Sequence, residues 1–322
     1  GLGGAVIGLF KSDETEFTAE NALATATSAE DGSFSFAGVP YGNWVLKELE
    51  SPEGFILSDE VIPVTVEEDG QVVEISLANE RVYGDLRLTK VDKDYPDNKL
   101  TGAEFEVYRD TNGNKELDEG DELLGKLEET STGIYEMSHI LYGGVFVKET
   151  KAPEGFLLDE NAYYVEITEN GKIYEVENEA GIGFTNMAQT GSLRIEKTSS
   201  DGNVEGFSFR VTGANGYDQT FKTDKNGEIF IEGLRVGDYT VSEVSDGASA
   251  NYVLPADKTV TIFADKTTVA EMHNELRDTP KTGDDSKPWL WAALMGVSAM
   301  GAAALGVAAY VGKRKKGKNT VK

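Results

Sequence analysis

Lysine, glutamate and asparagine recur at strand positions that also carry apolar side chains. Alternate residues of a β-strand point to the same face, so Lys90 and Lys197 each share a face with the two apolar residues that precede them at alternate positions. The same parity holds for three glutamates and three asparagines: Glu48, Glu149, Glu243, Asn79, Asn186 and Asn274. An isolated buried charge is so costly that the group usually becomes neutral or acquires a partner. The pattern therefore predicts that an amine, a carboxyl and a carboxamide meet inside the protein.

These three groups can form an amide bond. Burial disfavours both charged forms, which lowers the pKa of a lysine and raises that of a glutamate. A neutral carboxylic acid can then polarise the carboxamide for attack by the neutral amine and pass a proton to the departing ammonia. Each set of groups would react once, so we expect self-processing and not an enzyme. The alternative is a lysine that extends to solvent, or a lysine–glutamate ion pair without a bond.

The spacing of these residues indicates an internal repeat of roughly 80 to 105 residues. A glycine lies sixteen residues before each glutamate, at Gly32, Gly133 and Gly227. Asn178 also satisfies the strand parity in the second copy. We prefer Asn186, because it precedes Lys197 by eleven residues, the distance from Asn79 to Lys90.

Short alternating runs separated by glycine-rich turns predict an all-β protein of tandem sandwiches. We expect domains at residues 1–82, 83–190 and 191–276. The segment Leu2–Phe10 matches Leu100–Tyr108, so the first domain is expected to be N-terminally truncated, with its lysine about nine residues upstream of Gly1. Cysteine is absent, so no disulfide can staple these domains.

The chain carries a formal charge of -27. Residues 284–322 contribute +5, which leaves -32 for residues 1–283. Such an acidic surface repels nucleic acid and anionic lipid, and it favours divalent cations. The two histidines, His139 and His273, have no partner at the spacing of a catalytic triad.

The C-terminal residues predict one transmembrane helix. Trp289–Val311 is uncharged and long enough to cross about 30 Å of hydrocarbon. A basic tail follows at 312–322, and a linker at 277–288 precedes the helix. The basic tail is typical of a cytoplasmic anchor, which places the N-terminal bulk outside the cell.

The linker contains a pentapeptide that, together with the helix and tail, resembles the cell-wall sorting signal of Gram-positive surface proteins. Its residues are Thr279, Pro280, Lys281, Thr282 and Gly283. The resemblance implies that a sortase cleaves the Thr282–Gly283 bond and transfers the threonine acyl group to an amine of peptidoglycan or of a pilus subunit. Thr279 stands where that family usually has leucine, which leaves the class of sortase open.

The repeats resemble the collagen-adhesin B-type (SpaA-like, prealbumin-like) domains of Gram-positive pilins and adhesins. The resemblance rests on LRLTKVD at 86–92, VKETKAPEGFLLD at 147–159, GFTN at 183–186 and related segments of the other copies. It implies prealbumin/Ig-like sandwiches whose lysine and asparagine form an intramolecular isopeptide bond, assisted by glutamate. The implied pairs are Lys90 with Asn186 (Glu149) and Lys197 with Asn274 (Glu243), whereas Glu48 and Asn79 lack a lysine in this sequence.

We therefore expect the structural stalk of a cell-wall-anchored surface protein or pilin subunit that supports adhesion. One alternative is that the repeats themselves bind a host matrix protein or a glycan. Another is a wall-associated enzyme, whose active site would have to lie upstream of Gly1. No cofactor is required by the expected chemistry.

One acidic loop is close to the calcium-binding pattern. Its oxygen-bearing residues are Asp110, Asn112, Asn114, Glu116, Asp118 and Asp121. Lys115 replaces the glycine that is usual at the sixth position. The loop is thus either a Ca²⁺ site or a solvated acidic turn.

Overall fold

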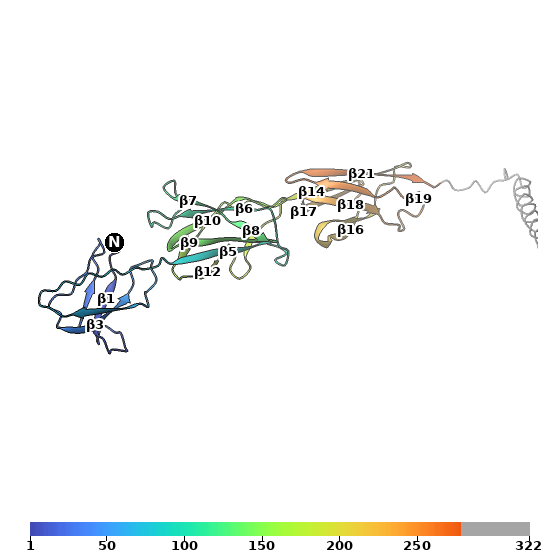
Figure 1. Cartoon of the computed structure of the whole chain (residues 1–322). Helices are drawn as coiled ribbons and strands as arrows, with labels where there is room; N and C mark the ends of the chain where they lie inside the picture. Colours follow the sequence, from blue (N-terminus) through green and yellow to red (C-terminus); the bar gives the residue numbers. More distant parts are fainter. Residues whose placement is uncertain (278–322) are drawn as a thin grey trace, which may run out of the picture.

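Three β-rich units follow one another along the chain, and the computed structural model describes them over residues 1–277 (Figure 1). We call residues 1–82 unit 1, residues 83–190 unit 2 and residues 191–276 unit 3. The predicted sorting motif, membrane helix and basic tail lie outside the described residues. Within residues 1–277, no helix is long and apolar enough to cross a membrane.

Unit 2 is a sandwich of two sheets. Its strands are β5 (Tyr83–Asp92), β6 (Glu104–Arg109), β7 (Glu122–Lys126), β8 (Glu128–Ser131), β9 (Ile134–Leu141), β10 (Gly143–Lys151), β11 (Ala162–Ile167), β12 (Ile173–Glu175) and β13 (Phe184–Asn186). One sheet has the order β12-β5-β9-β8, with β13 also paired to β5, and the other has the order β11-β10-β6-β7. The first and last strands of the unit, β5 and β13, therefore lie side by side, and they are parallel.

Unit 3 repeats this architecture. Its strands are β14 (Thr190–Ser199), β15 (Ser208–Thr212), β16 (Asp218–Lys222), β17 (Glu228–Arg235), β18 (Gly237–Glu243), β19 (Tyr252–Val253), β20 (Lys258–Ile262) and β21 (Thr267–Leu276), with one turn of 3-10 helix, η1 (Ala214–Gly216). The sheets have the orders β17-β14-β21-β19 and β16-β15-β18-β20. Here too the first and last long strands, β14 and β21, are parallel neighbours.

Unit 1 has one hydrogen-bonded sheet, of order β2-β1-β3-β4. Its strands are β1 (Val6–Lys11), β2 (Ala24–Thr27), β3 (Gly42–Glu50) and β4 (Val61–Val66). This sheet corresponds to β7-β6-β10-β11 of unit 2. Residues 33–37 and 72–80 form no strand, although their counterparts in units 2 and 3 do. Within residues 1–82, the first of the three expected sandwiches therefore has one of its two sheets. In units 2 and 3 the counterpart segments form strands by hydrogen bonding to β5 or β14.

Alternation of side chains explains why these sequences form strands with a buried face. In β5 every second residue from Gly84 to Lys90 is buried, while those between are partly exposed. Apolar burial of this kind stabilises a sheet by roughly 25 cal/mol per Å² removed from water. The core of unit 2 includes Phe105 and Phe184, whose rings meet edge to face at 5.0 Å. The all-β prediction is confirmed for the described residues.

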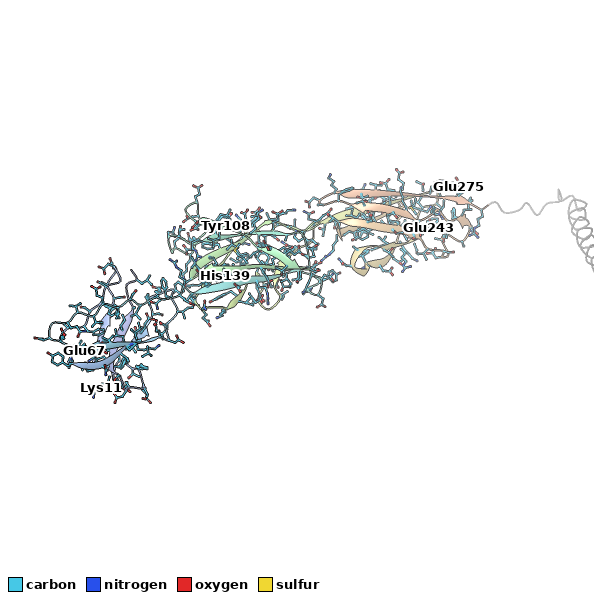
Figure 2. The ribbon with its side chains drawn as sticks, viewed as in Figure 1. Lys11, Glu67, Tyr108, His139, Glu243 and Glu275 are labelled. Atoms are coloured by element: carbon cyan, nitrogen blue, oxygen red, sulfur yellow. The ribbon has the colours of Figure 1, made fainter. Side chains whose placement is uncertain are left out.

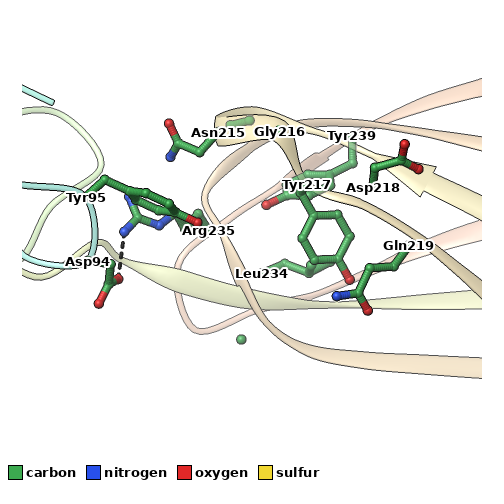
Figure 3. A pocket seen from close by; sticks show the side chains of 12 residues that line it. Asp94, Tyr95, Asn215, Gly216, Tyr217, Asp218, Gln219, Leu234, Arg235 and Tyr239 are labelled. Atoms are coloured by element: carbon green, nitrogen blue, oxygen red, sulfur yellow. Dashed lines mark hydrogen bonds and ion pairs between the residues drawn. The ribbon is translucent and has the colours of Figure 1, made fainter. Parts of the chain in front are cut away.

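Arg235, at the end of β17, joins unit 3 to unit 2. Its guanidinium donates to Asp92 Oδ1 at 2.8 Å. It also donates to Asp94 Oδ2 at 2.6 Å and lies 4.7 Å from the ring centroid of Tyr95 (Figure 3). Burial, the largest single effect, would raise the pKa of Asp92. Hydrogen bonds from Arg235 and from the backbone N–H groups of Asp94 and Tyr95, together with the charge of Arg235, outweigh burial and keep this pKa below its ordinary value. Asp92 is only 2 % exposed, so loss of Arg235 would leave a buried carboxylate without its counter-ion. The junction is therefore held by charge as well as by the short connection.

Candidate functional site

The candidate lysines and asparagines lie on neighbouring parallel strands of one sheet. In unit 2, Lys90 faces Phe184 and Asp92 faces Asn186 across β5 and β13. In unit 3, Lys197 faces Met272 and Ser199 faces Asn274 across β14 and β21. In both units the lysine stands two residues before the residue opposite the asparagine. Because residues two apart share a face, lysine and asparagine are diagonal neighbours on the same face, within reach of a long side chain.

The glutamates reach these pairs from the opposite sheet. Glu149 lies in β10 and Glu243 lies in β18. Figure 2 labels Glu243 in unit 3. All six side chains of the two sets are buried, and Lys90, Glu149 and Asn274 are 0 % exposed. Each set therefore bridges the two layers of its sandwich through the dry core.

In unit 2 the three groups are in contact. Asn186 Nδ2 donates to Glu149 Oε2 at 2.8 Å, and Lys90 Nζ lies 3.6 Å from Glu149 Oε1. The lysine also donates to the carbonyl of Phe184 at 3.1 Å and lies 5.0 Å from the centroid of that ring. Glu149 Oε1 and Asn186 Oδ1 accept no hydrogen bond. The amine, the acid and the amide thus form one buried cluster whose polar atoms are incompletely satisfied.

Unit 3 has the same cluster with the lysine turned away. Asn274 Nδ2 donates to Glu243 Oε1 at 2.6 Å, while Glu243 Oε2 and Asn274 Oδ1 accept nothing. Lys197 Nζ donates to the carbonyl of Thr198 and lies 4.3 Å from the ring centroid of Phe207. A rotation of the flexible lysine side chain is therefore needed before it can approach Asn274.

Unit 1 holds the acid and the amide alone. Asn79 Nδ2 donates to Glu48 Oε2 at 2.7 Å, and Glu48 Oε1 accepts nothing. The unit has two lysines, of which Lys11 is exposed and Lys47 donates to the carbonyl of Ser58. Neither lysine contacts the Glu48–Asn79 pair within the described residues.

The structure distinguishes the two candidate asparagines of unit 2. Asn186 is the one that contacts Glu149. Asn178 instead donates to Asp159 Oδ2 at 2.9 Å and exchanges hydrogen bonds with the backbone of Thr185. Asn178 therefore holds the loop before β13 in place.

Backbone groups that the sequence analysis did not consider also hold the glutamates. The N–H ten residues after the glutamate donates to it, from Ser58 to Glu48 Oε2 at 2.8 Å and from Asp159 to Glu149 Oε2 at 2.9 Å. The repeated PEGFIL and PEGFLL segments were a usable signal for this contact, because they place the same turn after both glutamates. Unit 3 has no such segment after Glu243.

A family comparison matches all three units. The SpaA family, a prealbumin-like fold domain, matches residues 1–81, 84–180 and 191–276. The chain belongs to the SpaA family. No curated protein matches it.

Among solved structures, these SpaA domains are similar to the Bacillus anthracis TIE protein. The two share 26 % identity with a TM-score of 0.64 over 85 % of this chain and 48 % of that chain. The chain thus spans about half the length of that structure. Further matches have lower TM-scores: 0.35 with the major pilin subunit of Bacillus cereus (14 % identity, 86 % and 95 % of the two chains) and 0.29 with a minor pilin of Streptococcus agalactiae (18 % identity, 62 % and 99 %).

Burial in these SpaA units favours the neutral forms of the two lysines and of Glu243. It lowers the pKa of Lys90 from its ordinary value of 10.5 to about 8, against the attraction of Glu149. Burial likewise lowers the pKa of Lys197 and raises that of Glu243. A neutral amine, which is the nucleophilic form, is therefore accessible near neutral pH at Lys90. In unit 3 the shifts of Lys197 and Glu243 also favour the neutral forms.

The glycines sixteen residues before Glu149 and Glu243 lie against the lysine-bearing strands of their units. Gly133 has φ +64°, and a Cβ there would stand 3.0 Å from the carbonyl oxygen of Lys90. At Gly227, with φ +82°, a Cβ would stand 2.6 Å from the carbonyl oxygen of Lys197. Both glycines also accept the lysine N–H, at 2.7 and 2.8 Å. The repeated glycine thus permits close approach of a turn to the lysine backbone.

Replacing Gly133 by Ala should destabilise unit 2 by about 2–4 kcal/mol, from left-handed strain together with overpacking against Lys90. Gly113→Ala is the matched control, because Gly113 has φ +71° with nothing near its Cβ position. Urea unfolding of both variants separates the two causes. Equal losses of stability would show that contact with the lysine strand contributes nothing.

In the acidic loop of unit 2, carboxylate side chains accept hydrogen bonds from backbone N–H groups of the same loop. Asp110 accepts from the N–H groups of Gly113 and Lys115, and Asp121 accepts from those of Thr111 and Asp118. Two asparagine side chains donate to Asp118. Over residues 1–277, no group of three or more acidic or histidine side chains is arranged to hold a metal ion. Calcium binding by this loop stays a prediction.

Proposed function

We propose that the chain is the structural stalk of a sortase-anchored surface protein or pilin subunit, stabilised by Lys–Asn isopeptide bonds that form without an enzyme. The SpaA family and its pilin- and adhesin-type relatives support a cell-surface protein of a Gram-positive bacterium. The observation that carries the covalent part is the buried contact of Glu149 with both Lys90 and Asn186.

A stable buried ion pair is a weaker account of this contact. An ammonium has three donors, whereas Lys90 Nζ makes one hydrogen bond and lies 3.6 Å from a carboxylate oxygen that accepts none. Desolvation of two charges is offset only when geometry is excellent and the remaining polar atoms are satisfied. The incomplete satisfaction of the cluster favours a reaction that removes both charges.

The proposed reaction balances without any co-reactant. Neutral Lys90 Nζ attacks Asn186 Cγ, so that the Nζ–Cγ bond forms and the Cγ–Nδ2 bond breaks. Glu149, already hydrogen-bonded to Nδ2, transfers the proton lost by Nζ to the leaving nitrogen, which departs as ammonia. Lys197, Glu243 and Asn274 act in the same way in unit 3. Because each carboxamide is consumed, the chain is a reagent and not a catalyst.

Anchoring is proposed from the residues beyond the described part of the chain. Sortase would cleave at Thr282–Gly283 and join Thr282 to an amine of peptidoglycan or of another pilus subunit. The helix at 289–311 and the basic tail at 312–322 would hold the precursor in the membrane until that transfer. The stalk then presents its N-terminal side away from the wall and supports adhesion.

Intact mass tests the covalent part of the proposal. Two bonds should lower the mass of the chain by two molecules of ammonia, about 34 Da below the sequence mass. Glu149→Ala should retain only the bond of unit 3, with a deficit of about 17 Da.

The matched control is Asn178→Ala, which removes the neighbouring carboxamide that does not contact Glu149 and should retain the full deficit. Digestion should yield one cross-linked peptide pair containing Lys90 and Asn186, and one containing Lys197 and Asn274. A chain at its full sequence mass would refute the bonds.

A further inference from the structure

A pocket of about 460 Å³ lies at the junction of units 2 and 3, beside the Arg235 contact (Figure 3). Its volume is within the roughly 300–1,000 Å³ of small-molecule sites. Unit 2 contributes Asp94 and Tyr95 to its walls, and unit 3 contributes residues 214–219, 233–235 and 239. We call this the junction pocket. Because both units line it, the pocket is complete only where the two units meet.

Three tyrosine rings line the junction pocket. Tyr95 is 44 % exposed, Tyr217 is partly buried and Tyr239 is buried. The rings of Tyr217 and Tyr239 meet edge to face with their centroids 5.6 Å apart, and the ring of Tyr217 is seen face-on in Figure 3. On the unit 2 side, the guanidinium of Arg235 lies over the ring of Tyr95. Each unit thus contributes one accessible aromatic ring whose position is fixed by a neighbouring side chain.

The charged groups of the junction pocket are already paired. Arg235 donates to both Asp92 and Asp94. Asp218 accepts from Arg210 at both of its carboxylate oxygens. The formal charge of -27 on the whole chain disfavours an anionic ligand, and the guanidinium in the wall disfavours a cationic one. The electrostatics of the pocket therefore match a neutral ligand.

The junction pocket also offers carboxamide groups for hydrogen bonding. Asn215 and Gln219 are both exposed in its wall. Within residues 1–277, the one side-chain hydrogen bond of these two carboxamides is a contact of 3.5 Å from Asn98 Nδ2 to Asn215 Oδ1. A carboxamide both donates and accepts, as does each hydroxyl group of a polyhydroxylated ligand. Leu234, the large aliphatic residue of the lining, is only 2 % exposed, so the pocket gives an apolar peptide side chain little to contact.

We propose that the junction pocket binds a neutral saccharide, with a sugar ring packed against Tyr95 and Tyr217 and its hydroxyl groups hydrogen-bonded to Asn215 and Gln219. A pyranose ring has C–H groups that pack on an aromatic face and hydroxyl groups around its edge. Tyrosine, with an apolar ring and a polar tip, suits such a ligand. The inference goes beyond the proposed function, because a stalk needs no ligand. Since both units supply contacts, a bound saccharide would also stabilise the junction between them.

Saturation-transfer NMR of the full chain tests the site. The probes are the methyl glycosides of glucose, galactose, mannose and N-acetylglucosamine, together with lactose. At least one of them should receive saturation, strongest at the C–H protons of one ring face, because that face would pack against the tyrosines. Titration of the responding sugar then gives its affinity. A chain that transfers saturation to none of these sugars overturns the inference.

Variants assign the binding to the junction pocket. Tyr95→Ala should weaken binding by about 10-fold or more, whereas Tyr95→Phe should keep most of the affinity, because the ring remains. Gln219→Ala should weaken binding by about 2- to 10-fold through loss of a hydrogen bond. Thr220→Ala is the matched control and should bind as the unmodified chain does, because adjacent residues of β16 point to opposite faces.

The remaining outcomes separate the site from the class of ligand. Unchanged affinity in both Tyr95→Ala and Gln219→Ala would place the sugar elsewhere on the chain and overturn the assigned site. Tighter binding of glucuronate, glucosamine or tri-alanine than of the neutral sugars would overturn the assigned ligand. The ammonia deficit of units 2 and 3 does not depend on this pocket, so the proposed function stands or falls separately.

Discussion

Pulled from its two ends, the Asn186→Ala variant should lengthen by about 300 Å in one step that the unmodified chain does not show. The step corresponds to the 95 residues between Lys90 and Asn186, at about 3.3 Å per extended residue. In the unmodified chain the proposed bond would join β5 to β13, so tension would pass from Lys90 to Asn186 without loading the strands between them. Single-molecule force extension measures this length directly.

The same variant should also lose equilibrium stability. Closing a loop of this size removes about 4–5 kcal/mol of unfolded-state conformational freedom. Asn178→Ala is the control, because it alters the same region without touching Glu149. A 300 Å step in the unmodified chain or in this control would show that unit 2 is not cross-linked. Unfolding of unit 1 should add the same extension in the unmodified chain and in every variant. This common step identifies recordings in which a single molecule is held.

The junction between units 2 and 3 lies directly on the proposed load path. Only ten residues separate Asn186 from Lys197, and they include the connection that leads into β14. Arg235 binds Asp92, which is the residue opposite Asn186 in the sheet. The charged contact between the units thus joins the strand ends that would carry force. In the proposed stalk, this contact would therefore stabilise the point where the covalently linked strands of unit 2 lead into those of unit 3.

Strand parity and spacing were sufficient to identify the buried clusters. A polar residue on the apolar face of a strand is unfavourable unless it has hydrogen-bonding partners. Each lysine, glutamate and asparagine on such a face therefore indicated by itself that a partner lies nearby. The eleven-residue spacing also selected Asn186, which contacts Glu149, over Asn178, which contacts Asp159. These features depend on local pattern, which the sequence displays directly.

The aromatic neighbours of the lysines could not be predicted in this way. Lys90 lies over Phe184, from the last strand of unit 2, whereas Lys197 lies over Phe207, which precedes β15 in unit 3. The two rings reach equivalent places from different points of the repeat, so no common spacing marks them. Arg235 was missed for a similar reason, because its partners Asp92 and Asp94 are more than 140 residues away in the sequence.

The single-sheet structure of unit 1 also escaped prediction from pattern. The segment around Ile75 and Leu77 alternates as a strand should, and both residues pack against the core. Strand structure nevertheless requires a hydrogen-bonded neighbour, which the alternation of side chains does not reveal. Apolar periodicity thus located the buried face but not the sheet that would complete it.

Blocking the bond should expose the titration of Lys90. In Asn186→Ala the amine stays free, with its pKa lowered by burial to about 8, from 10.5 when exposed. Between these values the unfolded state binds more protons than the folded state, so stability rises with pH. The gain should be about 3 kcal/mol between pH 8 and pH 10.5 and should be absent below pH 8, where both states are protonated. Urea unfolding across this range measures it.

Two comparisons isolate this effect from the other groups that titrate at high pH. The unmodified chain should not show the rise, because an amide nitrogen does not titrate in this range. Adding Lys90→Met to Asn186→Ala should abolish the rise, since it removes the amine and keeps an apolar side chain of similar length in the core. A rise that persists in the double variant would assign the titration to another residue. Its absence in Asn186→Ala would mean that Lys90 reaches solvent when unbonded, and the burial that favours the neutral nucleophile would then be lost.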